Sequence, residues 1–275
     1  MDFGSYLTRV REQGPLIQCI TNFVTVNDCA NILLATGASP SMAEDIREAA
    51  EAARGASALV CNLGAIDKVD SMIAAGQAAN EAGHPVVLDP VAAGSTTLRQ
   101  RESAHLLETV RFTVIRGNAS EIRALARGEL AGSGVDVGGE DAITESSLPR
   151  TVELAKLLAN KTGAVVAVSG PIDVLSDGER TVLLRNGCAT MARITGSGCM
   201  LTAVLGAFCG AAPDRPFEAA CAAVAAIGVA GELAEQRRLR NGTGNATFRT
   251  DLIDAVFNLT PEQLNGGVRY EIYQG

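Results

Sequence analysis

The amino-acid sequence predicts an α/β protein with a mostly parallel central sheet and helices on both faces. Strand-like and helix-like segments alternate through the first two thirds of the chain, the order that parallel strands with helical crossovers produce. The strand-like runs are continuously apolar rather than alternating, as strands buried on both faces are. No internal repeat or linker-rich segment divides the 275 residues. We therefore expect one domain over residues 1–275.

The predicted elements follow one another in a regular order through this part of the chain. They are a strand at 57–64, a helix at 68–83, a buried strand within 84–95, a helix at 97–110, a strand, turn and helix within 112–127, and a strand at 163–171. The carboxyl ends of parallel strands share one edge of a sheet, and open α/β sheets bind their ligands outside that edge. We expect the functional site there.

The regular order breaks at residues 172–187. Two β-rich runs flank Asp177-Gly178, a dipeptide typical of a tight hairpin. Two Ala-rich helices are predicted after it, at 198–211 and 216–238. Residues 126–147 are polar and rich in glycine, which predicts a mobile surface loop.

The charge of the chain limits its partners. Asp and Glu number 31 against 23 for Lys and Arg, giving a formal net charge of −8, and there is no basic run. A nucleic-acid surface needs concentrated positive charge, so no nucleic-acid partner is expected. The longest apolar stretches look too short, and too rich in small residues, to span a bilayer. An anionic substrate must then be bound by helix N-termini, a few Arg residues or a metal ion.

The cysteine and histidine content indicates the compartment and excludes some chemistry. Seven cysteines occur without CxxC or zinc spacing, and the N-terminus carries no signal peptide. An odd number of cysteines in such a chain predicts a reducing, cytoplasmic location. His84 and His105 are the only histidines, too few for a His-based metal site and poorly placed for a Ser-His-Asp triad.

Polar side chains stand where predicted strands end. Asp89 and Ser169 each end a strand, and Arg116 ends another, with Asn118 and Glu121 following at the spacing of a helix cap. Each position has a structural alternative, because Asp before Pro begins turns and Asn-x-x-Glu caps a helix without any ligand. These residues alone leave both interpretations open.

Residues 195–199, Thr-Gly-Ser-Gly-Cys, lead directly into an apolar helix. Free N–H groups at a glycine-rich helix start bind phosphate without a cation. The patterns of a P-loop and of a dinucleotide fingerprint are both absent from this stretch. Cys199 at a helix start is expected to have a lowered thiol pKa, although as a nucleophile it would lack a histidine base. The alternative is a tight turn before a core helix.

Taken together, these segments resemble the hydroxyethylthiazole kinases, thiamin-salvage members of the ribokinase-like superfamily. The resemblance covers nearly the whole chain and is carried by residues 19–45, 86–94, 115–122, 167–170 and 195–208. It implies a ribokinase-like three-layer sandwich without a separate lid. It also implies ATP-dependent phosphorylation of the hydroxyl of 4-methyl-5-(2-hydroxyethyl)thiazole, with Mg²⁺, by a homotrimer whose active sites lie between subunits.

The resemblance further implies roles for residues at matching positions of this sequence. The implied assignments are Met42, Asn22, Val24 and Gly196 for the thiazole; Arg116 and Ser169 for ATP; Asp89 and Glu121 for Mg²⁺ through water; and Gly196, Gly198 and Cys199 for catalysis. These roles agree with local chemistry, since Arg forms a planar fork for phosphate and Mg²⁺ takes few carboxylates and several waters. Cys199 stands where most ribokinase-like enzymes have an Asp base.

Some positions of this sequence depart from the family pattern. Ser169 replaces the usual Thr, Ser197 replaces Ala, and residues 243–248 replace a Gly-Pro-Gly-Ser-Phe segment.

Other functions are compatible with parts of the site. One alternative function is that of an ATP- or ADP-dependent dehydratase that repairs hydrated nicotinamide nucleotides, which should carry Asp at position 199. The others are a non-catalytic thiazole- or nucleotide-binding protein and a thiol-dependent hydrolase.

Overall fold

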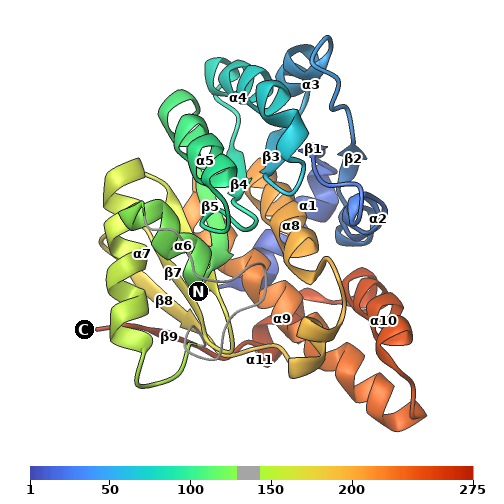
Figure 1. The fold of residues 1–275 in the computed structure, drawn as a ribbon. Coiled ribbons are helices and arrows are strands. Elements are labelled where there is room, and N and C mark those ends of the chain that lie inside the picture. Colours follow the sequence, from blue (N-terminus) through green and yellow to red (C-terminus); the bar gives the residue numbers. More distant parts are fainter. Residues whose placement is uncertain (129–142, 275) are drawn as a thin grey trace.

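A computed structural model describes residues 1–128 and 143–274, and every strand in these residues belongs to one sheet (Figure 1). The strands are β1 (Leu16–Ile20), β2 (Ser39–Ser41), β3 (Ala58–Asn62), β4 (Val86–Asp89), β5 (Val114–Asn118), β6 (Val165–Ser169), β7 (Asp173–Ser176), β8 (Thr181–Leu184) and β9 (Tyr270–Ile272). Their order is β2-β1-β3-β4-β5-β6-β7-β8-β9. The first six pair in parallel, and β7, β8 and β9 pair antiparallel. The predicted mostly parallel sheet is confirmed.

Helices cover both faces of this sheet, as predicted. One layer contains α3 (Ala49–Gly55), α4 (Val69–Ala82), α5 (Thr97–Thr109), α6 (Ala119–Arg127) and α7 (Leu148–Thr162). The other contains α1 (Phe3–Gln13), α2 (Val26–Thr36), α8 (Ser197–Ala211), α9 (Pro216–Asn241), α10 (Asn245–Asn258) and α11 (Pro261–Gly267). Two short 3₁₀ turns, η1 (Ile66–Lys68) and η3 (Ala189–Arg193), complete the described elements.

The continuous apolar strands divide their side chains between two cores. In β3, Val60 packs with the α8 side of the sheet, whereas Leu59 and Cys61 pack with the α4 side. All three side chains are fully or almost fully buried. A strand buried on both faces has no solvent side that would favour polar residues, which explains the unbroken apolar run.

The register of the parallel strands brings the polar strand ends together. Asn62, the last residue of β3, pairs with Asp89, the last residue of β4. Asn118 of β5 pairs in the same way with Ser169 of β6. The edge that was expected to hold the functional site is therefore polar across four neighbouring strands, and the N-terminus of α8 lies against it.

The predicted hairpin is confirmed between β7 and β8. The carboxylate of Asp177 closes its turn by accepting a hydrogen bond of 2.7 Å from the Arg180 N–H. Because β7 runs antiparallel to β6, this turn lies at the sheet edge opposite the carboxyl ends of the parallel strands.

The expectation that the apolar segments are too short to cross a membrane is wrong for α9. Its 26 residues are long and apolar enough by length and composition. Within the protein, however, 83% of its most apolar window is buried. The small side chains of this helix allow α1, α8 and α10 to pack closely around it, and its apolar character serves the core.

Most of the predicted surface loop at 126–147 lies outside the described residues. Of the parts that are described, Arg127 ends α6 and Gly128 caps it in the left-handed conformation. At the other end, Ile143 is only 2% exposed and belongs to the core on the α7 side. The described end of the segment is thus anchored by a buried side chain.

Candidate active site

Asp89 is the buried acid at the centre of the polar sheet edge. Asp89 is 1% exposed. Its Oδ2 accepts hydrogen bonds of 2.9 Å from the amide of Asn62 and of 2.9 Å from the hydroxyl of Thr202 on α8. Burial raises the pKa of this carboxyl, while the nearby Arg116 opposes the rise. Neither Asn62 nor Thr202 was predicted from the sequence, although Asn62 lies near the end of the strand expected at 57–64.

Arg116 extends from β5 between Asp89 and the start of α8. Its Nη1 lies 3.8 Å from Asp89 Oδ1. On the other side, a Cβ at position 198 would collide with the guanidinium, so the group rests directly against the backbone of Gly198. Its Nε is buried and has no hydrogen-bond partner among the described residues. The guanidinium therefore has donor capacity to spare beside the helix start.

Glu121 caps its own helix, as the structural alternative predicted. Its two carboxylate oxygens accept 2.8 Å hydrogen bonds from the backbone N–H groups of Asn118 and Ala92, and the Asn118 side chain accepts from the Glu121 N–H. The cap does not remove it from the site, however. Burial and then the charge of Asp89 raise the pKa of Glu121, so the two carboxylates affect each other.

The N-terminus of α8 presents free backbone donors at the same place. The first intrahelical hydrogen bond runs from the Met200 N–H to the Gly196 carbonyl, at 2.8 Å. The N–H groups of residues 197–199 therefore have no acceptor within the helix. Gly196 caps the helix with φ +84°, and a Cβ there would lie 2.6 Å from the Thr25 side chain. Both facts explain why glycine occupies this position.

Cys199 lies just inside this helix start and does not have the lowered pKa that its position predicted. Its Sγ accepts hydrogen bonds from the amides of Asn62 (3.2 Å) and Asn22 (3.4 Å). Burial and then the charge of Asp89 raise the pKa of the thiol, against these hydrogen bonds. The prediction was wrong because burial and a neighbouring carboxylate outweigh the helix end.

The residues predicted for the thiazole pocket are brought together only in part. Asn22 contacts Cys199 directly and also accepts a 3.2 Å hydrogen bond from the Thr25 N–H. Met42 follows the edge strand β2 and packs, half-buried, against the core on the α8 side. Val24 is 56% exposed. Of these three predicted residues, Asn22 alone makes a hydrogen bond to the centre of the site.

Two further polar side chains, those of Ser169 and Asp173, lie beyond Arg116. Only Ser169 was predicted from the sequence. The Ser169 hydroxyl donates to the Gly117 carbonyl at 3.3 Å. Asp173 Oδ1 accepts from the Gly170 N–H at 3.1 Å. Burial raises the pKa of Asp173 to about 7, against this hydrogen bond and the charge of Arg116. The sequence placed Asp173 only in a hairpin strand, and nothing in that pattern indicates its nearness to Arg116.

The raised pKa of Asp173 predicts a pH-dependent gain in stability for Asp173→Asn. Above about pH 4 the unfolded chain releases this proton, whereas the folded protein retains it to about pH 7, so wild-type stability falls across that interval. The amide is not ionised. We expect thermal unfolding to show the variant gaining roughly 1 to 3 kcal/mol over wild type between pH 4 and pH 8. A difference that stays constant with pH would contradict this assignment.

The two carboxylates suit a magnesium ion that keeps most of its water. No cluster of three or more potential metal-ligating side chains occurs in the described part of the chain, so an all-protein cage is not available there. Among the described residues, Asp89 Oδ1 has only the long contact to Arg116. Both oxygens of Glu121 already accept hydrogen bonds from backbone N–H groups. This donor set fits one carboxylate ligand, with a second carboxylate acting through water.

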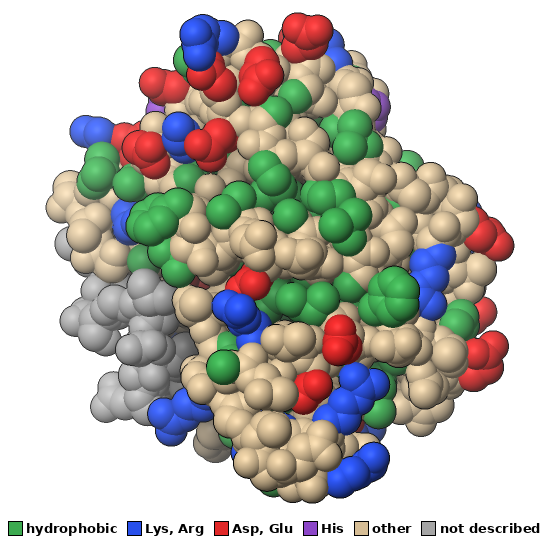
Figure 2. Space-filling model, turned by 90° about the vertical axis from the view of Figure 1, so that its right-hand side faces the viewer, with side chains coloured by type: hydrophobic (Ala, Val, Ile, Leu, Met, Phe, Trp, Pro, Cys, Tyr) green, Lys and Arg blue, Asp and Glu red, His purple; other side chains and the backbone are tan. Residues whose placement is uncertain are grey.

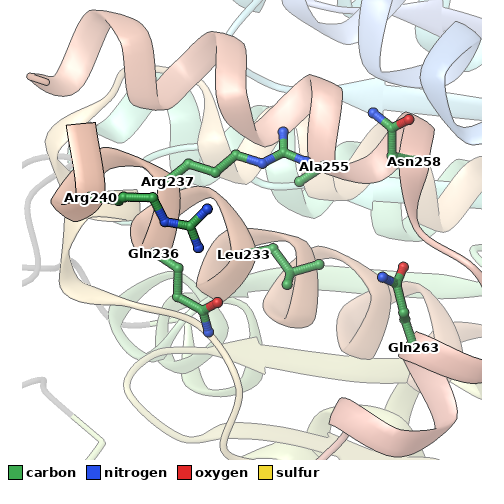
Figure 3. Close-up of a pocket in the computed structure, with 7 residues that line it drawn as sticks. All are labelled: Leu233, Gln236, Arg237, Arg240, Ala255, Asn258 and Gln263. Atoms are coloured by element: carbon green, nitrogen blue, oxygen red, sulfur yellow. The ribbon is translucent and has the colours of Figure 1, made fainter.

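A separate pocket lies between α9, α10 and α11 and contains none of these residues. Its volume is about 150 Å³. Its lining residues are Leu233, Gln236, Arg237, Arg240, Ala255, Asn258 and Gln263, and Figure 3 shows Arg237 extending toward Ala255 of α10. The pocket is polar and distinct from the sheet edge.

An exposed apolar surface adjoins the site. Phe23 is 90% exposed and follows Asn22 in the chain, and Val24 and Leu34 are each 56% exposed. Figure 2 shows hydrophobic side chains gathered in a band across the face on the α2 side of the molecule. Contiguous apolar surface of this kind is typical of a contact with another protein.

Comparisons with known proteins agree with one another. The model of the hydroxyethylthiazole kinase family matches residues 7–262. A hydroxyethylthiazole kinase of Clostridium acetobutylicum is 46% identical over 269 residues, covering 97% of this chain and 98% of that protein. One of Cereibacter sphaeroides is 46% identical over 270 residues, covering 98% of each.

Solved structures give the same result for the fold. The hydroxyethylthiazole kinase of Pyrococcus horikoshii OT3 matches with a TM-score of 0.86 and 35% identity, covering 99% of each chain. The pyridoxal kinase of Staphylococcus aureus, in complex with pyridoxal, matches with a TM-score of 0.55 and 16% identity, over 78% of this chain and 86% of that one. The second match supports the arrangement of the sheet and helices alone.

Proposed function

The chain belongs to the hydroxyethylthiazole kinase family, and we propose that it transfers the γ-phosphoryl group of ATP to the hydroxyl of 4-methyl-5-(2-hydroxyethyl)thiazole, a step of thiamin salvage. One observation carries the location of this reaction. The guanidinium of Arg116 lies against Gly198 at the start of α8, next to the free N–H groups of that helix end, and contacts Asp89. Such a convergence of donors stabilises the charge on a phosphoryl group during transfer.

The reaction at this site follows from the placement of the donors. The thiazole hydroxyl oxygen forms a bond to the γ-phosphorus, the bond from that phosphorus to the β,γ-bridging oxygen breaks, and ADP leaves. The N–H groups of residues 197–199 and the Arg116 guanidinium neutralise the equatorial oxygens of the phosphoryl group. Gly196 and Gly198 leave room for it. The transition state is loose, so the hydroxyl proton leaves late, to a phosphate oxygen or to water. Cys199 positions the hydroxyl more than it activates it.

The nucleotide and its metal ion are assigned to the same sheet edge. Arg116 and Ser169 would contact the ATP phosphates, as the family positions imply. Asp89 would hold Mg²⁺, because its Oδ1 has only a long contact to Arg116 among the described residues. Glu121 would reach the ion through water, because both of its carboxylate oxygens already accept hydrogen bonds from backbone N–H groups. When bound, Mg²⁺ would neutralise negative charge on the phosphates of ATP.

The thiazole pocket and the oligomer form a second part of the proposal. Met42, Asn22, Val24 and Gly196 would contact the ring and its hydroxyethyl arm, with the Met42 thioether as an adaptable surface. The exposed Val24 and Phe23 beside Asn22 support an active site completed by a neighbouring subunit. We place the protein in the cytoplasm as a homotrimer, with residues 1–275 acting as one ribokinase-like domain.

Phe23→Asp should disrupt this oligomer. Because Phe23 is 90% exposed in the isolated chain, the change costs the folded monomer little, but it would bury a charge in a subunit contact. Light scattering is expected to show smaller particles than wild type, with the melting temperature of the monomer nearly unchanged. Phe257→Asp, at an exposed residue of α10, is the matched control. Particles of unchanged size would remove Phe23 from the proposed interface.

A simple assay tests the proposed activity. ADP release from Mg-ATP should depend on added hydroxyethylthiazole and should fall to background when the thiazole is omitted or Mg²⁺ is chelated. ADP release that is independent of the thiazole would instead indicate another acceptor or an ATPase.

A further inference from the structure

Asn62 is buried between the two chemical groups at the centre of the site. It is 1% exposed and ends β3 directly opposite Asp89. Its Nδ2 donates hydrogen bonds to Asp89 Oδ2 at 2.9 Å and to Cys199 Sγ at 3.2 Å. One side chain thus joins the acid assigned to the metal ion and the sulfur at the start of α8.

The hydrogen bonds of Asn62 fix the orientation of its amide. Both Nδ2 hydrogens have acceptors, and Oδ1 accepts from the Asn22 amide at 3.1 Å and from the Gly64 N–H at 2.9 Å. A flipped amide would direct its N–H₂ group at two donors and its oxygen at a carboxylate, losing the contacts to Asn22, Gly64 and Asp89. The side chain therefore has one stable orientation.

This orientation determines what surrounds Cys199. Its sulfur accepts from Asn62 and from Asn22, and Asn22 is itself hydrogen-bonded to Asn62 Oδ1. The two amides and the sulfur form a closed triangle of contacts on one side of Cys199. They occupy sulfur lone pairs on that side and fix the position of the sulfur relative to the helix start.

Asp89 does not need Asn62 as its only hydrogen-bond donor. Thr202 donates to the same Oδ2 at the same distance of 2.9 Å. A residue required only to satisfy the buried carboxylate would duplicate Thr202. The contact that Thr202 does not duplicate is the one to Cys199.

We propose that Asn62 is a positioning residue for phosphoryl transfer, holding the Cys199 sulfur in fixed relation to Asp89 so that the substrate hydroxyl meets an ordered sulfur at the start of α8. This inference rests on the proposed kinase function. It goes further by assigning a role to a side chain that makes no direct contact with either substrate in the scheme above.

A double-mutant cycle with Cys199 tests the proposal. Asn62→Ala is expected to lower kcat by roughly 30-fold and to change the KM for the thiazole less than about threefold. In a Cys199→Ala background, the same change should cost less than about fivefold, because its contact with sulfur is already gone. Thr202→Val is the matched control: it removes a donor to Asp89, together with a contact to the Gly198 carbonyl at 3.1 Å, but no contact to the Cys199 sulfur. Its effect should be of similar size in both backgrounds.

Two outcomes would overturn the proposal. One is an equal loss of kcat from Asn62→Ala in both backgrounds. The other is a loss from Asn62→Ala no greater than that from Thr202→Val. Circular dichroism and thermal unfolding establish that each variant is folded, and Asn62→Ser replaces the Ala variant in the cycle if the latter is not.

A readout that does not depend on kinase activity separates this proposal from the proposed function. Alkylation by iodoacetamide, followed for the Cys199 peptide by mass spectrometry, should show a higher midpoint pH in Asn62→Ala than in wild type or Thr202→Val, because a donor to the thiolate is lost. If kinase activity is absent but this shift occurs, the proposed function fails and the positioning contact remains. An unchanged midpoint contradicts the contact.

Discussion

Asp89→Asn is expected to lower kcat by about 100- to 1,000-fold while changing the KM for hydroxyethylthiazole less than about threefold. The amide can still accept the hydrogen bonds from Asn62 and Thr202, so the fold around it is preserved. It loses the negative charge that faces Arg116 at 3.8 Å and that suits a magnesium ligand. The effect should therefore fall on the chemical step.

Steady-state kinetics at several Mg²⁺ concentrations measure this effect. Asp177→Asn is the matched control, because this acid also contacts an arginine, Arg180, at 2.8 Å but lies in the β7–β8 turn at the opposite edge of the sheet. Its kcat should stay within about twofold of wild type. A kcat of Asp89→Asn close to that of this control would remove Asp89 from the reaction.

Gly198→Ala is expected to weaken ATP binding and to lower kcat/KM for ATP by about 100-fold. A Cβ at this position would collide with the guanidinium of Arg116, which would be displaced from the N–H groups at the start of α8. The collision would affect both groups of donors that are proposed to bind the transferring phosphoryl group. The atoms nearest to a Cβ at Gly198 would be those of Arg116 and of none of the residues proposed to contact the thiazole, so the KM for thiazole should change much less.

Calorimetric titration with ATP and steady-state kinetics together measure this loss. Gly55→Ala is a suitable control because a Cβ at Gly55, in the last position of α3, meets nothing within 4 Å. Its ATP affinity should equal that of wild type. If Gly198→Ala bound ATP as tightly as the control does, the start of α8 would not be the phosphate-binding site.

Local patterns predicted much of the fold for physical reasons that the structure makes explicit. The continuous apolar run that includes Leu59 and Val60 predicted a strand buried on both faces, and its side chains do divide between two cores. Asp177-Gly178 predicted the hairpin. In contrast, the exposed strand β9, which pairs with β8 from nearly ninety positions later in the chain, has no local pattern that predicts its pairing.

The candidate site was predictable where the ends of strands and the glycine-rich start of a helix carry it. Asp89, Arg116 and Ser169 follow from the rule that ligands bind at the carboxyl ends of parallel strands. Asn62 also ends a strand, but its proposed role depends on a contact with Cys199 from a distant part of the sequence, which no local pattern indicates. The raised pKa of the Cys199 thiol was missed for a related reason. Its position in the helix is local information, whereas its burial and its nearness to Asp89 come from the fold.

The assignment of the chain to its family, and to the kinases, does not depend on the individual site residues. The match to the family model and to relatives 46% identical over nearly the full chain separates the kinase from the dehydratase alternative, which should also carry Asp at position 199. The missing histidine base already disfavoured a thiol-dependent hydrolase. The individual site residues determine how the chain performs phosphoryl transfer.

The central claim is that the phosphoryl group of ATP is transferred to the thiazole alcohol at the start of α8. Mass spectrometry of the purified protein incubated with hydroxyethylthiazole and Mg-ATP tests it most directly. We predict thiazole monophosphate in an amount equal to the ADP formed, with Gly198→Ala forming it at least about tenfold more slowly. Folded wild-type protein that forms no thiazole monophosphate at high concentration would contradict the claim.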